Sequence, residues 1–150
     1  MVLSDGKSTA YQQTPYPATA AQFSPDGKWV AYVSEETGAS DVWVQTFPAS
    51  SGKWQISMGG GTQPRWSNDG REIFYLAADG KLMAVKVNPG TSFEYGRPVA
   101  LFETRTSRVL SSAFAYAVSR DGRFLLENIA GEARPSPLTV VTNWWAGIPK

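Results

Sequence analysis

Phe-Ser-Pro-Asp-Gly-Lys-Trp-Val-Ala-Tyr, at residues 23–32, is the first of three copies of one motif. The second copy is Trp-Ser-Asn-Asp-Gly-Arg-Glu-Ile-Phe-Tyr at residues 66–75, and a weaker third copy is Val-Ser-Arg-Asp-Gly-Arg-Phe-Leu-Leu at residues 118–126. Asp-Gly supports the positive φ of a tight turn, and the aromatic and β-branched residues after it favour a pleated, half-buried strand. The motif therefore predicts three β-hairpins.

The spacing of the copies is typical of propeller blades. The Asp-Gly pairs lie 43 residues (Asp26 to Asp69) and 52 residues (Asp69 to Asp121) apart, within the range of blades or solenoid units. Helical periodicity is absent. We expect strands at 22–24, 29–34, 41–47, 54–57, 64–67, 72–77, 81–87, 98–102, 113–119, 123–129 and 138–144. The predicted fold class is all-β, with β-propeller blades of four antiparallel strands.

These strands divide the chain into three predicted units. Blade one spans 18–58, blade two spans 59–103, and blade three spans 104–150 and lacks its outer strand. Residues 8–17 hold an outer strand, Ser8–Thr14, that has no unit of its own. Because a ring typically needs four to eight blades, the chain is either a fragment of a larger propeller or half of a six-bladed one. In the second case we expect a homodimer in which each N-terminal strand completes the partner's third blade.

Composition excludes several function classes. The net charge is +1, so no basic surface argues for nucleic acid. The chain has no His and no Cys, which excludes a Ser-His-Asp triad, a His-ligated metal and a disulfide framework. No apolar run is long enough to span a bilayer, and residues 1–16 lack the apolar core of a signal peptide. We predict no catalytic residue, no cofactor, no metal and no membrane insertion.

Residues 23–28 resemble the TolB-type, or WD40-like, propeller repeat. The longer segment 13–48 is similar to the last propeller blades of bacterial serine/threonine kinase-like sensor proteins, and the ending at 138–147 resembles their C-terminus. The resemblance implies a propeller fold over nearly the whole chain. It also implies a periplasmic or other extracytoplasmic location if the chain is part of such a sensor. It implies little about function, because propellers support many unrelated activities.

Other patterned residues have structural explanations. Asp26, Asp69 and Asp121 are expected to cap their own turns through hydrogen bonds to the backbone. The motif serines have no His to activate them and lie in no Gly-x-Ser-x-Gly sequence. The run Gly59-Gly60-Gly61-Thr62 lacks the Gly-Lys-Ser/Thr continuation of a phosphate loop, so we expect a flexible link between blades.

Arginine and tryptophan are the candidate partner-binding residues, because both residue types are enriched in recognition surfaces. Trp144 and Trp145 cannot both face one side of a strand, so one of them is expected to be exposed or at an interface. The candidates are Arg65, Arg105, Arg108, Trp144 and Trp145. The predicted function is a non-catalytic binding or assembly module for a protein, peptide or small ligand. The alternative is an accessory propeller of an enzyme, a kinase or a prolyl-oligopeptidase-like peptidase, whose catalytic domain lies elsewhere.

Overall fold

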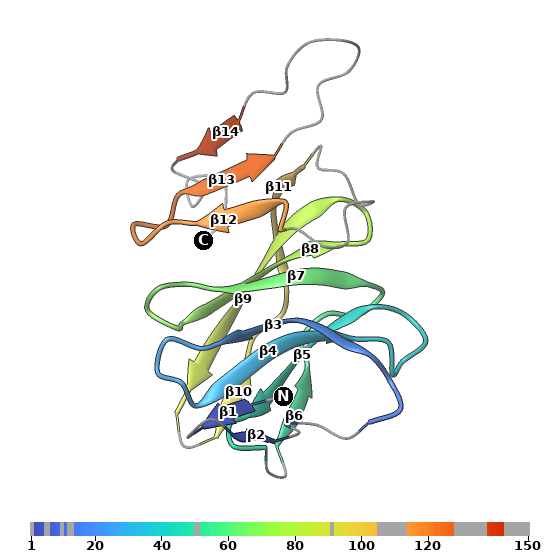
Figure 1. Cartoon of the computed structure of the whole chain (residues 1–150). Helices are drawn as coiled ribbons and strands as arrows, with labels where there is room; N and C mark the ends of the chain where they lie inside the picture. Colours follow the sequence, from blue (N-terminus) through green and yellow to red (C-terminus); the bar gives the residue numbers. More distant parts are fainter. Residues whose placement is uncertain are drawn as a thin grey trace.

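The regular structure of the protein is entirely β. The computed structural model describes residues 2–4, 7–9, 11, 14–49, 52–90, 92–104, 114–127 and 138–142. Among these residues there is no helix, and so none that could cross a bilayer. The strands form antiparallel sheets whose members follow one another along the chain, and Figure 1 shows three of these sheets stacked in sequence order. The predicted all-β blade architecture is therefore confirmed.

Each sheet is a meander of neighbouring strands. Blade 1 has the order β3-β4-β5-β6, blade 3 has the order β12-β13-β14, and blade 2 between them begins β7-β8-β9 and ends in β10 and β11. The bounds are β3 Ala18–Phe23, β4 Trp29–Ser34, β5 Asp41–Thr46, β6 Lys53–Gln55, β7 Gly61–Trp66, β8 Glu72–Ala77, β9 Lys81–Pro89, β10 Phe93–Tyr95, β11 Val99–Glu103, β12 Tyr116–Val118, β13 Phe124–Glu127 and β14 Leu138–Val141. β3 contacts β7 and β7 contacts β12, so the first strands of successive blades lie together.

The Asp-Gly motifs form the predicted hairpin turns. In the first, Ser24 Oγ donates to Asp26 Oδ1 at 2.6 Å and accepts from the Trp29 N–H at 3.0 Å. Gly27 has a φ of 71°, in the left-handed region that favours glycine. The second turn repeats this arrangement at Ser67 and Asp69. The Lys28 N–H donates to Asp26 Oδ1 at 3.2 Å and the Arg71 N–H to Asp69 Oδ1 at 3.1 Å, so these two side chains cap their own turns as predicted.

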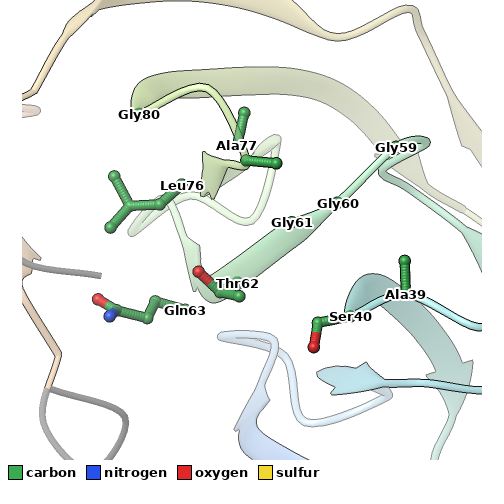
Figure 2. Close-up of a pocket in the computed structure, with 11 residues that line it drawn as sticks. Ala39, Ser40, Gly59, Gly60, Gly61, Thr62, Gln63, Leu76, Ala77 and Gly80 are labelled. Atoms are coloured by element: carbon green, nitrogen blue, oxygen red, sulfur yellow. The ribbon is translucent and has the colours of Figure 1, made fainter. Parts of the chain in front are cut away.

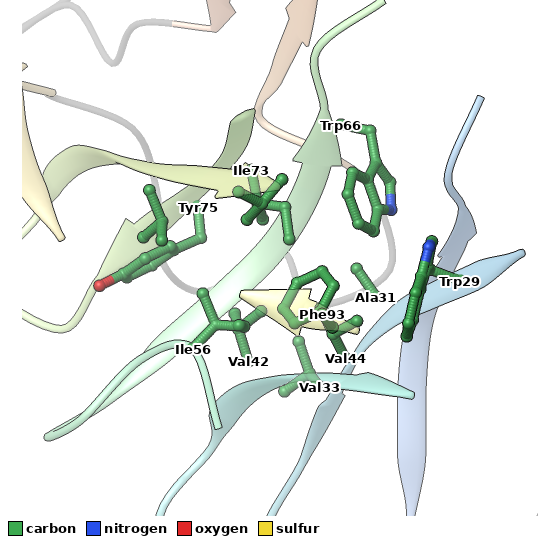
Figure 3. Close-up of a cluster of buried hydrophobic side chains, with 12 residues drawn as sticks. Trp29, Ala31, Val33, Val42, Val44, Ile56, Trp66, Ile73, Tyr75 and Phe93 are labelled. Atoms are coloured by element: carbon green, nitrogen blue, oxygen red, sulfur yellow. The ribbon is translucent and has the colours of Figure 1, made fainter. Parts of the chain in front are cut away.

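One core joins blades 1 and 2. Alternate residues of β4 (Ala31 and Val33) and of β8 (Ile73 and Tyr75) contribute buried side chains to it, as Figure 3 shows. Trp29 and Trp66 lie in this core, whereas Trp43 of β5 lies outside it, with Lys53 Nζ 4.7 Å from the centre of its ring. β4 and β8 alternate between two covered faces, which explains their continuous apolar sequences.

A short strand that the sequence analysis missed completes this core. β10 pairs with the end of β9, and its Phe93 is 3 % exposed. The Phe93 ring centroid lies 5.0 Å from that of Trp29, 5.1 Å from Trp54 and 6.4 Å from Trp66. β10 thus connects the outer part of blade 2 to the outermost strand of blade 1 through an aromatic cluster.

A second core joins blades 2 and 3. Phe74 and Leu76, on the other face of β8, pack with Tyr116 and Phe124 of blade 3. The Phe74 and Phe124 rings meet edge to face at 4.9 Å, a favoured geometry. In β13 the buried residues Phe124 and Leu126 alternate with exposed ones, and Leu125 is 40 % exposed. Blade 3 is therefore covered on only one face along β13.

The N-terminal strand differs from the one expected at Ser8–Thr14. The structure has β2 at Lys7–Thr9, paired with β1 at Val2–Ser4 in a two-stranded sheet. Beyond it, Tyr11 lies against blade 1, because its hydroxyl donates to the Thr46 carbonyl at 2.7 Å. Its ring centroid is 5.6 Å from that of Phe47.

Candidate functional site

A hollow of about 350 Å³ lies where blade 1 meets the first strand of blade 2. Figure 2 shows Leu76 and Gln63 on one side of it, and Ala39 and Ser40 of the β4–β5 loop on the other. Its lining residues are Ala39, Ser40, Gly59, Gly60, Gly61, Thr62, Gln63, Leu76, Ala77, Ala78 and Gly80. None of these has an ionisable side chain. The hollow therefore offers apolar surface, hydroxyls, an amide and backbone groups.

A second hollow of about 480 Å³ adjoins the first and shares the segment Gly59–Gly60 and residues Ala77 and Ala78 with it. Met58, which is 85 % exposed, stands at its border. A flexible, polarisable Met side chain adapts to the shape of a bound surface. The second hollow, unlike the first, is also lined by the ionisable residues Tyr75, Asp79 and Lys81.

A buried carboxylate holds the walls of the first hollow. Asp41, the first residue of β5, is 2 % exposed and accepts four hydrogen bonds. Oδ1 accepts from Ser57 Oγ at 2.8 Å and from the Gly60 N–H at 3.0 Å. Oδ2 accepts from Thr37 Oγ1 at 2.8 Å and from Gln55 Nε2 at 3.1 Å. Asp41 therefore ties the β4–β5 loop to the link that leads into β7.

Glycine is required in this link for two reasons. Gly60 has a φ of 106°, and a Cβ there would lie 2.8 Å from the Cβ of Ala78. A Cβ on Gly61 would lie 2.5 Å from Ser57 Oγ, while the Gly61 N–H donates to the Ser40 carbonyl at 2.7 Å. The glycine run is thus an inter-blade link, as the sequence predicts. The expectation that it is flexible is not met at Gly60 and Gly61, which close surroundings and hydrogen bonds hold in place.

The inner strand of blade 2 is bulged beside the hollow. The register shifts between Thr62 and Arg65, and Gln63 has a φ of 55°, which is uncommon for a residue with a side chain. Gln63 is held by blade 3: its Oε1 accepts from the Ala115 N–H at 2.7 Å, and its carbonyl accepts from the Tyr116 hydroxyl at 2.8 Å. The bulge therefore connects the hollow to the junction of blades 2 and 3.

Arg65, a sequence-predicted site residue, lies two residues further along β7. Its guanidinium carbon is 3.6 Å from the centre of the Phe114 ring, a cation–π contact. Its Nε atom is buried and has no hydrogen-bond partner among the residues that the structure describes. Burial, opposed by the nearby Tyr116, lowers the pKa of Arg65 from its ordinary value. The other predicted site residues, Arg105, Arg108, Trp144 and Trp145, lie outside the described residues.

The acidic residues of the turns do not gather into a site. Hydrogen bonds from Ser67 and from the Arg71 N–H hold the pKa of Asp69 below its ordinary value. Ser119 and Arg123 lower the pKa of Asp121 in the same way. Across the described ranges, no cluster of three or more Asp, Glu, Cys or His side chains is arranged to hold a metal ion.

Two solved structures are similar to the chain over part of their length. One is oligogalacturonate lyase from Vibrio parahaemolyticus, with a TM-score of 0.46 and 17% identity over 69% of this chain and 27% of that one. The other is TolB from Acinetobacter baumannii, with a TM-score of 0.42 and 16% identity over 91% of this chain and 44% of that one. The chain thus spans less than half of either protein. No protein-family model and no curated protein sequence matches it significantly.

Proposed function

We propose that the chain is a non-catalytic β-propeller module that binds a ligand in the hollow between blades 1 and 2. The observation that carries this proposal is the chemistry of the lining, which combines apolar side chains with neutral polar groups and contains no ionisable residue. General acid–base or nucleophilic catalysis needs an ionisable or activated side chain at the reacting atoms. A volume of about 350 Å³ is within the range of small-molecule sites.

The rigidity of the walls supports the same role. The hydrogen bonds of Asp41 and that of the Gly61 N–H to the Ser40 carbonyl fix the walls of the hollow. A site that is already formed loses less conformational entropy when a ligand binds. The neutral lining favours an uncharged group, such as an aliphatic side chain of a peptide or the apolar part of a small molecule.

A blocking variant tests this proposal. Thr62 is an exposed residue of β7 that lines the hollow, so Thr62→Trp should fill it with little effect on the fold. We expect neutral fragments screened by ¹H–¹⁵N NMR to shift the amide signals of 59–63 and 77–80 in the unmodified chain and to lose this effect in T62W.

The matched control is Thr19→Trp, because Thr19 occupies the corresponding exposed position of β3 and does not line the hollow. T19W should keep fragment binding. The proposal is wrong if no fragment shifts these amides, or if T62W and T19W bind equally well. It is also wrong if the purified chain shows turnover that one point substitution abolishes.

The resemblance of residues 13–48 and 138–147 to kinase-linked propellers favours a second reading of the same module, as an accessory domain of a larger enzyme. The hollow would then be a ligand-binding site in an accessory domain, and catalysis would take place in another domain of the same protein. Sequencing the complete reading frame distinguishes the two cases, because only the second contains a catalytic domain.

We also propose that the chain assembles as a homodimer that closes six blades. In the described residues blade 3 has three strands and β14 pairs with β13 alone, so one further strand beside β14 would give blade 3 the four strands of blade 1. A three-stranded, half-covered blade is a feature that a second chain can complete.

A further inference from the structure

The second hollow contains a polar group that the fold itself does not use. Tyr75 of β8 lines this hollow, and only 3 % of the residue is exposed, because its ring packs in the core of blades 1 and 2. Figure 3 shows the Tyr75 hydroxyl pointing out of the cluster of apolar side chains. Among the described residues this hydroxyl has no hydrogen-bond partner.

The Tyr75 hydroxyl is accessible to a ligand. In the described part of the chain the polar side-chain atoms that are both unpaired and fully buried belong to Trp29, Glu36, Trp43 and Arg65. The hydroxyl oxygen of Tyr75 is not one of them, so it keeps accessible surface, and that surface borders the second hollow. The ring is already fixed by its packing, so a hydrogen bond from this hydroxyl to a ligand costs little conformational entropy.

The charges near Tyr75 make its hydroxyl a donor to a neutral acceptor. Burial, and then the negative charges of Asp41 and Asp79, raise the pKa of Tyr75 to about 12. The hydroxyl therefore stays protonated at neutral pH and can donate to an oxygen such as that of a carbonyl. The same carboxylates repel an anion at this point, and Lys81 at the border of the hollow is already paired with Asp79 at 2.7 Å.

The apolar part of the second hollow favours an aromatic ring. Met58 and Met83 both line it, together with Pro98 and Ala100 at the outer part of blade 2. Thioether sulfur makes favourable contacts with aromatic rings, and the flexible methionine side chain adapts to their shape. The volume of about 480 Å³ is within the range of small-molecule sites.

We propose that the second hollow is a separate binding site for an uncharged aromatic carbonyl compound, such as an aryl amide or an aryl ketone. The Tyr75 hydroxyl donates to the carbonyl oxygen, and the ring contacts the thioether groups of Met58 and Met83. This site differs from the hollow between blades 1 and 2, whose lining includes neither a tyrosine nor a methionine.

The test uses benzamide as the probe, with cyclohexanecarboxamide as its aliphatic analogue and benzoate as its anionic analogue. The readout is the methyl signals of Met58 and Met83 in a ¹H–¹³C spectrum, each assigned by its loss in a Met→Leu variant. The chain has three methionines, so these signals are few. We expect benzamide to shift both signals saturably, with an affinity at least about threefold higher than that of either analogue.

A pair of tyrosine variants checks the role of the hydroxyl. Tyr75→Phe removes only the hydroxyl and should weaken benzamide binding about threefold to tenfold, the effect of one neutral hydrogen bond. Its urea unfolding midpoint should match that of the unmodified chain, because the hydroxyl has no partner in the described part of the fold. Tyr95→Phe is the matched control: Tyr95 is 43 % exposed and lines neither hollow, so benzamide affinity should stay within about twofold.

Each part of the inference has an outcome that overturns it. If the Met58 and Met83 signals do not shift up to the solubility limit of benzamide, the second hollow is not a site of this class. Equal affinities for the three probes overturn the aromatic carbonyl assignment, and equal affinities of Y75F and the unmodified chain overturn the role of the hydroxyl. Thr62 does not line the second hollow, so T62W should keep benzamide binding. Loss of binding in T62W would place benzamide in the first hollow and rule out a separate site.

Discussion

The carboxylate of Asp41 is the residue on which the candidate site depends most. Its two oxygens accept hydrogen bonds from Thr37 of the β4–β5 loop, from Gln55 of β6, and from Ser57 and Gly60 of the link between β6 and β7. A hydrogen bond to a charged group contributes about 1.5–3 kcal/mol, and donors left without acceptors in a buried place add a further cost. The walls of the hollow are therefore held by a side chain that does not itself line it.

Replacing Asp41 should destabilise the chain strongly. We expect Asp41→Ala to lower the free energy of unfolding by about 3 kcal/mol or more, because the donors from Ser57, Gly60 and Gln55 then lose their acceptor. Asp41→Asn should cost less, since it keeps one acceptor oxygen. Urea unfolding measures both. Glu94→Ala, at an exposed position, is the control and should stay within about 0.5 kcal/mol.

We expect Asp69 to make the free energy of unfolding depend on pH in the acidic range. Hydrogen bonds from Ser67 and the Arg71 N–H depress its pKa in the folded state. A depressed pKa means that the stabilisation is present above the unfolded value, about 3.9, and is lost as the pH falls through the folded value. Asp69→Asn should therefore be less stable than the unmodified chain at pH 7, and the difference should shrink as the pH falls below about 4.

Urea unfolding at pH 7, 4 and 2.5 measures this difference. Ser67→Ala, which removes the hydrogen-bond donor, should also lower the free energy of unfolding at pH 7. The double variant should lose less stability than the sum of the losses of the two single variants. A difference between D69N and the unmodified chain that stays constant with pH would contradict the role of this hydrogen bond.

At the scale of elements, the short strand β10 locks two blades together through Phe93. We expect Phe93→Ala to cost about 3–5 kcal/mol, the range for removing a buried aromatic side chain. Tyr95→Ala, on the same strand but 43 % exposed, should cost about 1 kcal/mol or less. Thermal unfolding compares the two. Similar losses for both would show that the aromatic cluster of Trp29, Trp54 and Trp66 does not depend on Phe93.

Local signals in the sequence predict some elements and miss others. The strands β4 and β8 occupy the expected ranges, because their turns and their apolar runs are encoded in adjacent residues. β10 was missed, since three residues between Gly90 and Pro98 carry no periodicity and the strand depends on distant aromatic rings. Asp41 was missed for the same reason: its four donors come from other parts of the chain, and three of them lie 14 to 19 residues away.

The third hairpin shows a further limit. Its sequence resembles the first two, yet Ser119 Oγ accepts from the N–H of Arg123, four residues on, whereas Ser24 and Ser67 accept from residues five positions on. Arg123 then pairs with Asp121 through its side chain. A motif fixes the kind of turn, and the number of residues in the loop is set by the strands that it joins.

At the scale of the whole molecule, three blades are too few for the rings of four to eight that are typical of propellers. Deleting residues 1–9 tests the homodimer proposed above, because it removes β1 and β2 and keeps Tyr11 against blade 1. We expect light scattering to give a dimer mass for the intact chain and a monomer mass or aggregates for the truncated one. An intact chain that is already a folded monomer rules out strand exchange.

Because several groups share the Asp41 carboxylate as their acceptor, the segment around Ser57 and Gly60 should open as one unit. The amide of Gly60 and the hydroxyl of Ser57 end on Asp41, and that hydroxyl in turn accepts from the amide of Val42. These groups cannot leave their acceptors one at a time without leaving a buried charge under-solvated. Their amide hydrogens should therefore exchange with deuterium at similar slow rates, as one cooperative unit. A ligand wider than the hollow could bind only after these hydrogen bonds open together. Its observed association rate would then reach a limit, the rate of opening, as the ligand concentration rises.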